Sequence, residues 1–205
     1  MNLKEYNVVF AVGSLILILL STTPTISLFA SFPDGEDNFS EFWLLGPNHL
    51  MQDYPFDVRI NQSSQVFVGV RNHMGSTSYY VIYAKFRNQT QPLPGALGST
   101  PSPLPPLYEY HALIADEGTW EMPLTFSILR ASRVDDSTLV SDISINDIVF
   151  SVNSSATWDS EDRGFNYQVF LELWLYNTTL MRFQYHNRFV AFWLNFTESL
   201  SESPV

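Results

Sequence analysis

The side chains that could do chemistry are few and scattered in this sequence. Asp159, Glu161 and Asp162 form a dense group of carboxylates in a predicted loop, just before Arg163 and Gly164. Alternating carboxylates on a loop can bind Ca²⁺ through their oxygens, but a solvated acidic turn has the same pattern. We therefore treat these three residues as weak calcium candidates and predict no other metal site and no cofactor.

Motifs of common enzymes are absent from the sequence. It has no cysteine, which excludes a thiolate nucleophile, a thiolate metal site and a disulfide framework. It contains no Gly-x-Ser-x-Gly elbow, no Walker loop and no His-Glu-x-x-His motif. The four histidines are scattered: His49, His73, His111 and His186. We predict no catalytic residues and a protein that is not an enzyme.

Asparagines in glycosylation sequons are a frequent motif. Modification at Asn-x-Ser/Thr marks surface positions of an exported protein. A Cys-free exported chain with many sequons is typical of an archaeal cell surface, and we predict a glycoprotein. The six candidate positions are Asn38, Asn61, Asn88, Asn153, Asn177 and Asn195.

Aromatic side chains supply the remaining candidate for binding. On the predicted strand 165–176, Phe170 and Trp174 lie opposite the apolar face. Phe189 and Trp193 have the same placement on the last predicted strand. If the strands pair, the four rings form an interaction patch that could bind protein or stack on sugars. In the alternative, a proline-rich loop covers this face and buries the rings as a second small core.

These candidates depend on a fold made of short β-strands. Alternating or continuous apolar segments with turn residues between them predict an antiparallel β-sandwich of about 7–8 strands. Residues 89–106 contain six of the twelve prolines and predict a surface loop. The predicted strands are 65–72, 79–87, 107–115, 123–129, 145–153, 165–176, 180–185 and 189–196.

An N-terminal transmembrane helix is predicted before this domain. No residue from Tyr6 to Pro33 is charged, and about 20 mostly apolar residues are enough to span a bilayer. Lys4 on the short side, against an acidic far side, places the N-terminus in the cytoplasm. We predict a single-pass signal-anchor that holds the protein in the cell membrane through residues 6–32, with the C-terminal domain extracellular. The alternative is a cleaved secretory signal, with Thr25-Ile26-Ser27 as a tolerable cleavage site.

The expected organisation has three parts. Residues 1–32 are a cytoplasmic stub and anchor (or signal peptide), residues 33–198 are the extracellular domain with its loop 89–106, and residues 199–205 are a disordered tail. The formal net charge of −11 with two lysines removes the cationic surface that nucleic-acid binding requires.

Six segments share a pattern with a known family: Phe39–Asn48, Tyr54-Pro55, Val66–His73, Gly118–Phe126, Phe170–Tyr176 and Arg188–Asn195. Together they resemble the archaeal membrane-protein family called domain of unknown function 1616. The resemblance implies an archaeal origin and an extracellular Ig-like β-sandwich beside a membrane anchor. Family members often carry several transmembrane helices before this domain, whereas this sequence has room for one. The family brings no established activity and no catalytic residues.

We therefore expect an interaction or scaffold module, or an accessory subunit of an archaeal membrane complex, with a protein partner. The alternative is a carbohydrate-binding or calcium-dependent recognition module of the cell envelope.

Overall fold

The computed structural model describes Val12, Ser14 and residues 38–95 and 100–197 of the chain. Contacts divide the chain into Met1–Asn38 and Phe39–Val205, and every strand lies in the second unit. Among the described residues, no helix has the length and apolar character needed to cross a bilayer. The predicted anchor lies outside the described residues except for Val12 and Ser14, and so does the predicted tail.

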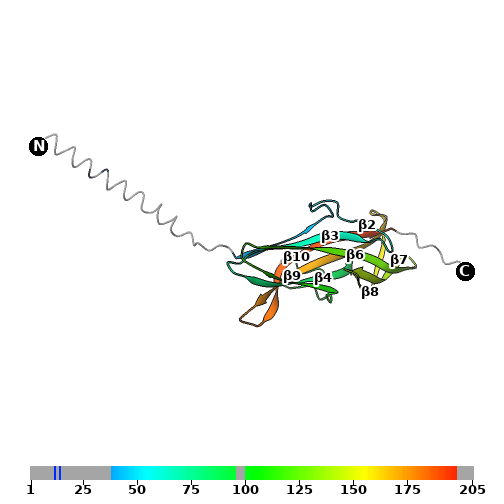
Figure 1. Ribbon diagram of the computed structural model, residues 1–205. Helices are drawn as coiled ribbons and strands as arrows, with labels where there is room; N and C mark the ends of the chain where they lie inside the picture. Colours follow the sequence, from blue (N-terminus) through cyan, green and yellow to red (C-terminus); the bar gives the residue numbers. More distant parts are fainter. Residues whose placement is uncertain (1–11, 13, 15–37, 96–99, 198–205) are drawn as a thin grey trace. The chain divides into compact units, whose positions relative to one another are not determined.

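The described part of the second unit is built from strands (Figure 1). They form a ten-stranded sheet, so the predicted all-β class is confirmed. The strands are β1 (Phe39–Leu45), β2 (Asp57–Val58), β3 (Ser64–His73), β4 (Ser78–Asn88), β5 (Tyr108–Ile114), β6 (Thr119–Val134), β7 (Ser137–Ile145), β8 (Ile148–Asp159), β9 (Gly164–Asn177) and β10 (Arg182–Phe196).

The sheet is open and curls at β8. Its main path runs β1-β3-β6-β7-β8-β9-β10-β2, and β4 joins β9 to β5. Most of β8 pairs with β7, whereas Trp158 and Asp159 at its end pair with β9. The change of partner along one strand connects the two halves of the sheet. All the strand pairs are antiparallel except the short parallel pair of β10 with β2.

Both halves of the curled sheet face one hydrophobic core. Val66, Val68 and Val70 of β3 are fully buried from one side, and Leu171 and Leu173 of β9 from the other. Successive residues of a strand point to opposite faces. Glu172, between Leu171 and Leu173, therefore lies on an outer face, together with its register partners Tyr83 on β4 and Phe189 on β10. Other buried core residues include Tyr80, Ile82, Leu124, Phe126, Ile128, Tyr167, Leu194 and Phe196.

The strand predictions are confirmed where apolar and polar residues alternate along the segment. They are wrong where apolar strand residues continue on both sides of a turn. The predicted strand 145–153 crosses the turn between β7 and β8, where Asn146 and Asp147 have φ of 48° and 65°. Two successive left-handed residues make a tight hairpin turn. The segments 180–185 and 189–196 lie largely in one strand, β10, with a register shift between Tyr185 and Arg188. The predicted number of about 7–8 strands is too low, because β1, β2 and β7 were missed.

Candidate functional site: an aromatic outer face

The outer face of β4, β9 and β10 carries rows of aromatic side chains. The antiparallel register places Val81, Trp174 and Tyr185 side by side, and the row next to it contains Tyr83, Glu172 and Phe189. Beyond Trp174, Tyr176 pairs with Phe183. We define the outer aromatic face by the six rings that pack together here: Tyr79, Tyr83, Trp174, Tyr176, Phe183 and Tyr185.

Two groups of ring contacts hold this face together. The Trp174 ring lies 5.6 Å from that of Tyr83, edge to face, and 5.9 Å from that of Tyr185. Phe183 lies edge to face with both Tyr79, at 5.0 Å, and Tyr176, at 5.2 Å. Edge-to-face pairs at these centroid separations are favourable because the positive ring edge meets a negative ring face. The rings therefore form a pre-ordered surface.

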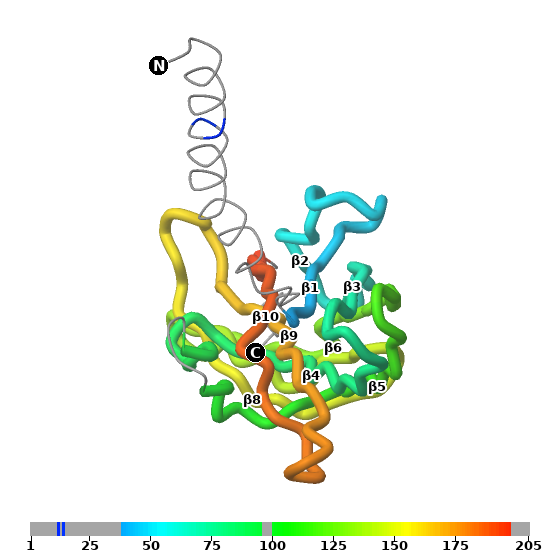
Figure 2. Tube along the Cα trace, turned by 90° about the vertical axis from the view of Figure 1, so that its left-hand side faces the viewer, coloured from blue at the N-terminus to red at the C-terminus, as the bar shows by residue number. Residues whose placement is uncertain are grey.

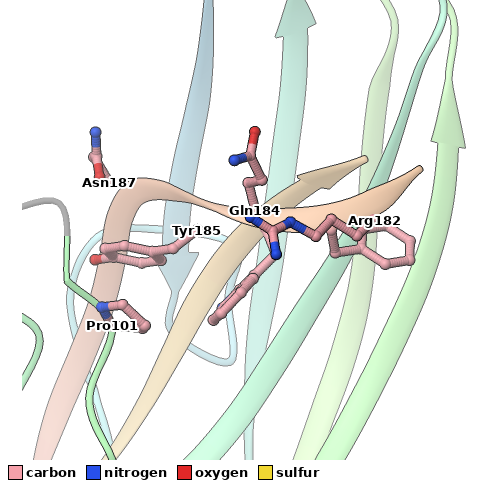
Figure 3. Close-up of a pocket in the computed structure, with 7 residues that line it drawn as sticks. Pro101, Arg182, Gln184, Tyr185 and Asn187 are labelled. Atoms are coloured by element: carbon pink, nitrogen blue, oxygen red, sulfur yellow. The ribbon is translucent and has the colours of Figure 1, made fainter. Parts of the chain in front are cut away.

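An open groove of about 470 Å³ runs along this face between the proline-rich loop and β10. Figure 3 shows Pro101 and Tyr185 close together, with Gln184 extending away from them. The groove combines ring faces with guanidinium and amide groups. Its lining residues are Pro101, Trp174, Arg182, Phe183, Gln184, Tyr185 and Asn187.

A buried ion pair fixes one wall of the groove. Lys85 Nζ lies 2.9 Å from Glu172 Oε2, and the two side chains are only 4% and 0% exposed. The loop completes the pair: Ser102 N–H donates to Glu172 Oε1 at 2.7 Å, and Lys85 Nζ donates to Ser102 C=O at 2.9 Å. Trp174 Nε1 donates to Glu172 Oε2 at 3.1 Å. Buried charges require such partners. The ion pair therefore both holds the loop at Ser102 and orients the Trp174 ring.

The rings of the predicted four-ring patch differ in burial. Phe170 is fully buried although it lies outside the main core cluster, next to Lys85 in register. The alternative prediction of a buried second core therefore fits Phe170. Its prediction as a contact residue of the interaction patch is corrected. Trp174 and Phe189 are half-buried and Trp193 is exposed, with the Arg87 guanidinium 5.4 Å above its ring.

Sequence reasoning missed four rings of the outer aromatic face: Tyr79, Tyr83, Phe183 and Tyr185. Tyr176 follows from the same alternation that places Trp174 opposite the apolar face of its strand. Burial raises the pKa of Tyr185 to about 12, with the Glu172 charge as a second cause. Its hydroxyl therefore stays protonated and can donate a hydrogen bond to a ligand in the groove. The signal for Phe183 and Tyr185 was that aromatic residues two positions apart stand on both sides of Asn177, as Trp174 and Tyr176 before it and as Phe183 and Tyr185 after it. This spacing becomes informative only when β9 and β10 are placed in register.

The calcium candidates close a turn between β8 and β9. Asp159 Oδ1 accepts hydrogen bonds from the Glu161 and Asp162 backbone N–H groups at 2.8 and 3.3 Å. Asn166 Nδ2 donates to Asp162 Oδ2 at 2.8 Å. Within residues 38–95 and 100–197, no three His, Asp or Glu side chains are grouped so that they could hold a metal ion. These contacts describe an acidic turn with a structural role.

The sequon asparagines differ in exposure. Asn38, Asn61 and Asn153 are exposed, whereas Asn88 and Asn177 are half-buried and use their side chains in turns. Asn177 Oδ1 accepts from the N–H groups of Thr179 and Leu180. The structure therefore offers three freely accessible positions for a glycan.

As a glycosylation candidate, Asn195 was predicted to lie at the surface, and its burial is a correction. It does share the outer face with Trp193, but it is only 2% exposed. Its Nδ2 donates to Asp57 Oδ1 at 3.2 Å and to Asp162 C=O at 3.0 Å. A Cβ added at Gly164 would lie 1.6 Å from Asn195 Oδ1. The turn between β8 and β9 covers the side chain, so a glycan at Asn195 is incompatible with the folded domain.

Three further groups with a shifted pKa make hydrogen bonds that stabilise the fold. Burial raises the pKa of Tyr110 to about 12, and its hydroxyl donates to Pro123 C=O at 2.8 Å. Burial also raises the pKa of Tyr167, which donates to Thr138 C=O. His73 lies at the surface, and its hydrogen bond with Glu117 raises its pKa. None of these groups lines the groove.

The fold and site define an all-β domain with a pre-ordered aromatic surface. Residues 33–135 match the family described as Domain of unknown function (DUF1616), and the chain belongs to this family. No curated protein sequence matches the chain.

Similar solved structures share little sequence with the chain. A β-glucosidase from Listeria innocua in complex with glucose has 11% identity and a TM-score of 0.40, over 78% of this chain and 16% of that chain. A chain in the complex of zinc 2-glycoprotein with prolactin-inducible protein, from human seminal plasma, has 11% identity and a TM-score of 0.37, over 80% of this chain and 98% of that chain. The chain thus spans about 16% of the length of the β-glucosidase it matches. At these scores the similarities carry no functional argument.

Proposed function

We propose that this protein is a non-enzymatic interaction module of an archaeal cell surface. An N-terminal anchor holds it in the membrane, and the strand domain binds a protein partner outside the cell as an accessory subunit of a membrane complex. The single observation that carries the proposal is the outer aromatic face. Aromatic side chains dominate the energy of interfaces because each ring buries a large area at low entropic cost.

Composition and sequon placement support the location. The stretch Tyr6–Pro33 carries no charge, as a bilayer-spanning segment requires. Asn38, Asn61 and Asn153 are exposed where a glycan would need to be. An Ig-like sandwich is part of the same proposal, and it is supported by the single core that both halves of the sheet enclose.

Affinity purification of the full chain from native membranes tests the binding role. Trp174→Ala combined with Trp193→Ala removes two rings of this side of the domain. Trp158→Ala is the control, because Trp158 is exposed to a similar extent as Trp193 and lies on β8, outside the outer aromatic face. We expect a specific partner with the parent chain and the control, and its loss with the double variant. Equal recovery with all three chains contradicts the proposed surface.

A second candidate function is carbohydrate recognition, favoured by the composition of the groove. Sugar rings stack on aromatic faces while their hydroxyls pair with polar side chains. Trp174 and Tyr185 supply the rings, and Arg182 and Asn187 supply donors. Titration with purified envelope polysaccharide should quench tryptophan fluorescence saturably, and Tyr185→Ala should weaken the binding. Absence of a saturable response removes this candidate and leaves protein recognition.

A further inference from the structure

The hairpin between β9 and β10 ends in two exposed apolar side chains. Leu180 is 49% and Met181 78% exposed. Asn177 Oδ1 fixes the turn by accepting hydrogen bonds from the N–H groups of Thr179 and Leu180, both at 2.9 Å. Met181 follows with a φ of 52°, in the left-handed region. A turn held by this geometry presents the two apolar side chains in a fixed position.

The hairpin tip lies at the end of the domain where β1 begins. Ser40, the second residue of β1, has its Oγ 3.1 Å from His186 Nε2 on β10. From His186 the chain runs back through five residue steps to Met181, which at about 3.3 Å per residue is about 16 Å. Figures 1 and 2 show the orange β9–β10 hairpin projecting beyond its neighbouring strands.

We propose that Leu180 and Met181 insert into the interfacial layer of the bilayer that holds the N-terminal anchor. This inference rests on the proposed membrane attachment through residues 6–32. The six residues 33–38 separate that segment from Phe39, and an extended chain spans at most about 3.6 Å per residue, or about 22 Å for six residues. This upper limit exceeds the projection of the hairpin, so an attachment through residues 6–32 permits the tip to reach the bilayer surface.

Charge is arranged to suit this contact. Arg182, the residue after Met181, is exposed and can reach phosphate groups. Acidic residues at this end are bound back from the tip: Glu117 and Glu41 to His73 beside Phe39, and Asp116 to Gly75 N–H. The tip therefore presents two apolar side chains and one cation, and its contact with lipid should depend on apolar burial more than on lipid charge.

A second pair of apolar side chains provides a matched control. Leu50 and Met51 are 51% and 76% exposed, almost the same as the tip pair. They follow Leu45, at the far end of β1 from Phe39. The six steps of β1 cover about 20 Å at 3.3 Å per residue. If exposed apolar area alone drove insertion, both pairs would enter lipid, whereas the inference selects Leu180 and Met181.

The absence of cysteine from the sequence makes a direct test straightforward. Met181→Cys and Met51→Cys are introduced separately into the full chain, labelled with an environment-sensitive fluorophore and reconstituted, free of glycans, into phosphatidylcholine vesicles. We expect the dye at position 181 to become several-fold brighter than the dye at position 51. Lipids that carry a nitroxide near the headgroup should quench it, and it should respond little to added salt.

The outcomes separate this inference from the proposed function. Failure of the chain to float with the vesicles overturns the membrane attachment, and the inference with it. Flotation with equal, water-like emission at positions 181 and 51 overturns the inference alone. Bright emission at position 181 without nitroxide quenching also overturns it, because the tip would then be covered by protein. Insertion at both positions contradicts the selective placement.

Discussion

Replacing Lys85 with methionine should destabilise the domain strongly. The substitution keeps most of the apolar stem but removes the ammonium group from Glu172, whose side chain has no exposed surface. Glu172 would keep its hydrogen bonds from Ser102 N–H and Trp174 Nε1, but as an uncompensated buried carboxylate. Breaking a buried ion pair by removing one partner costs about 3–5 kcal/mol.

This cost is large enough to measure by thermal unfolding. For a domain of about 150–250 residues, each kcal/mol lowers Tm by about 2–4 °C. We therefore expect Lys85→Met to lower Tm by about 6–20 °C. Glu172→Gln should have a similar effect, because it leaves the Lys85 ammonium group buried without a countercharge. Circular dichroism melts of the purified chain give Tm, and urea titrations give the free energy of unfolding.

A double-mutant cycle tests the reasoning behind this number. Lys85→Met combined with Glu172→Leu removes both charges, so much of the stability should return. The loop should nevertheless loosen, since the Ser102 N–H loses its acceptor. Faster proteolysis within residues 89–106 would report that change. Single and double variants that all melt within about 2 °C of the parent would refute the burial of this pair beneath the loop, since that difference corresponds to about 1 kcal/mol or less.

Three further predictions follow from other contacts. The pKa of His73 is raised by its hydrogen bond with Glu117, so its contribution to stability is complete below its ordinary pKa of 6.5 and declines as the pH rises through the raised value. His73→Gln should flatten the stability profile above pH 6.5 in urea titrations, and an unchanged slope there would count against this coupling. Mass spectrometry of the native protein should find Asn195 unmodified, because its side chain is covered; a glycan on folded material would show that the turn opens. Gly69→Ala should cost about 1–3 kcal/mol by overpacking, since the new Cβ would lie 2.2 Å from the Trp43 ring; a stability equal to that of the parent would mean that the ring moves freely.

Local periodicity predicted the strands that have one clearly buried face. Val66, Val68 and Val70 mark β3 by their alternation, and the outward placement of Trp174 follows from the same rule on β9. The turn at Asn146 and Asp147 was not predictable in this way, because apolar residues continue on both sides of it and hide the boundary.

Contacts between distant segments could not be predicted from spacing. Lys85 and Glu172 lie on strands far apart in sequence, and the hydrogen bond from Ser102 N–H to Glu172 joins a third distant segment to them. Asn195 occupies the predicted face, but the turn that covers it belongs to a different hairpin. Single-strand patterns assign side chains to faces, whereas exposure also depends on the loops that cover each face.

The most direct test of the central claim is site-specific photocrosslinking of the outer aromatic face in native membranes. A photoreactive phenylalanine replaces Tyr185 in one chain and Val149, which is exposed on β8, in another. Our account predicts one discrete adduct at Tyr185, with the partner that affinity purification recovers, and no adduct at Val149. Adducts of equal yield at the two positions, or adducts at Val149 alone, would contradict the assignment of this face as the contact surface.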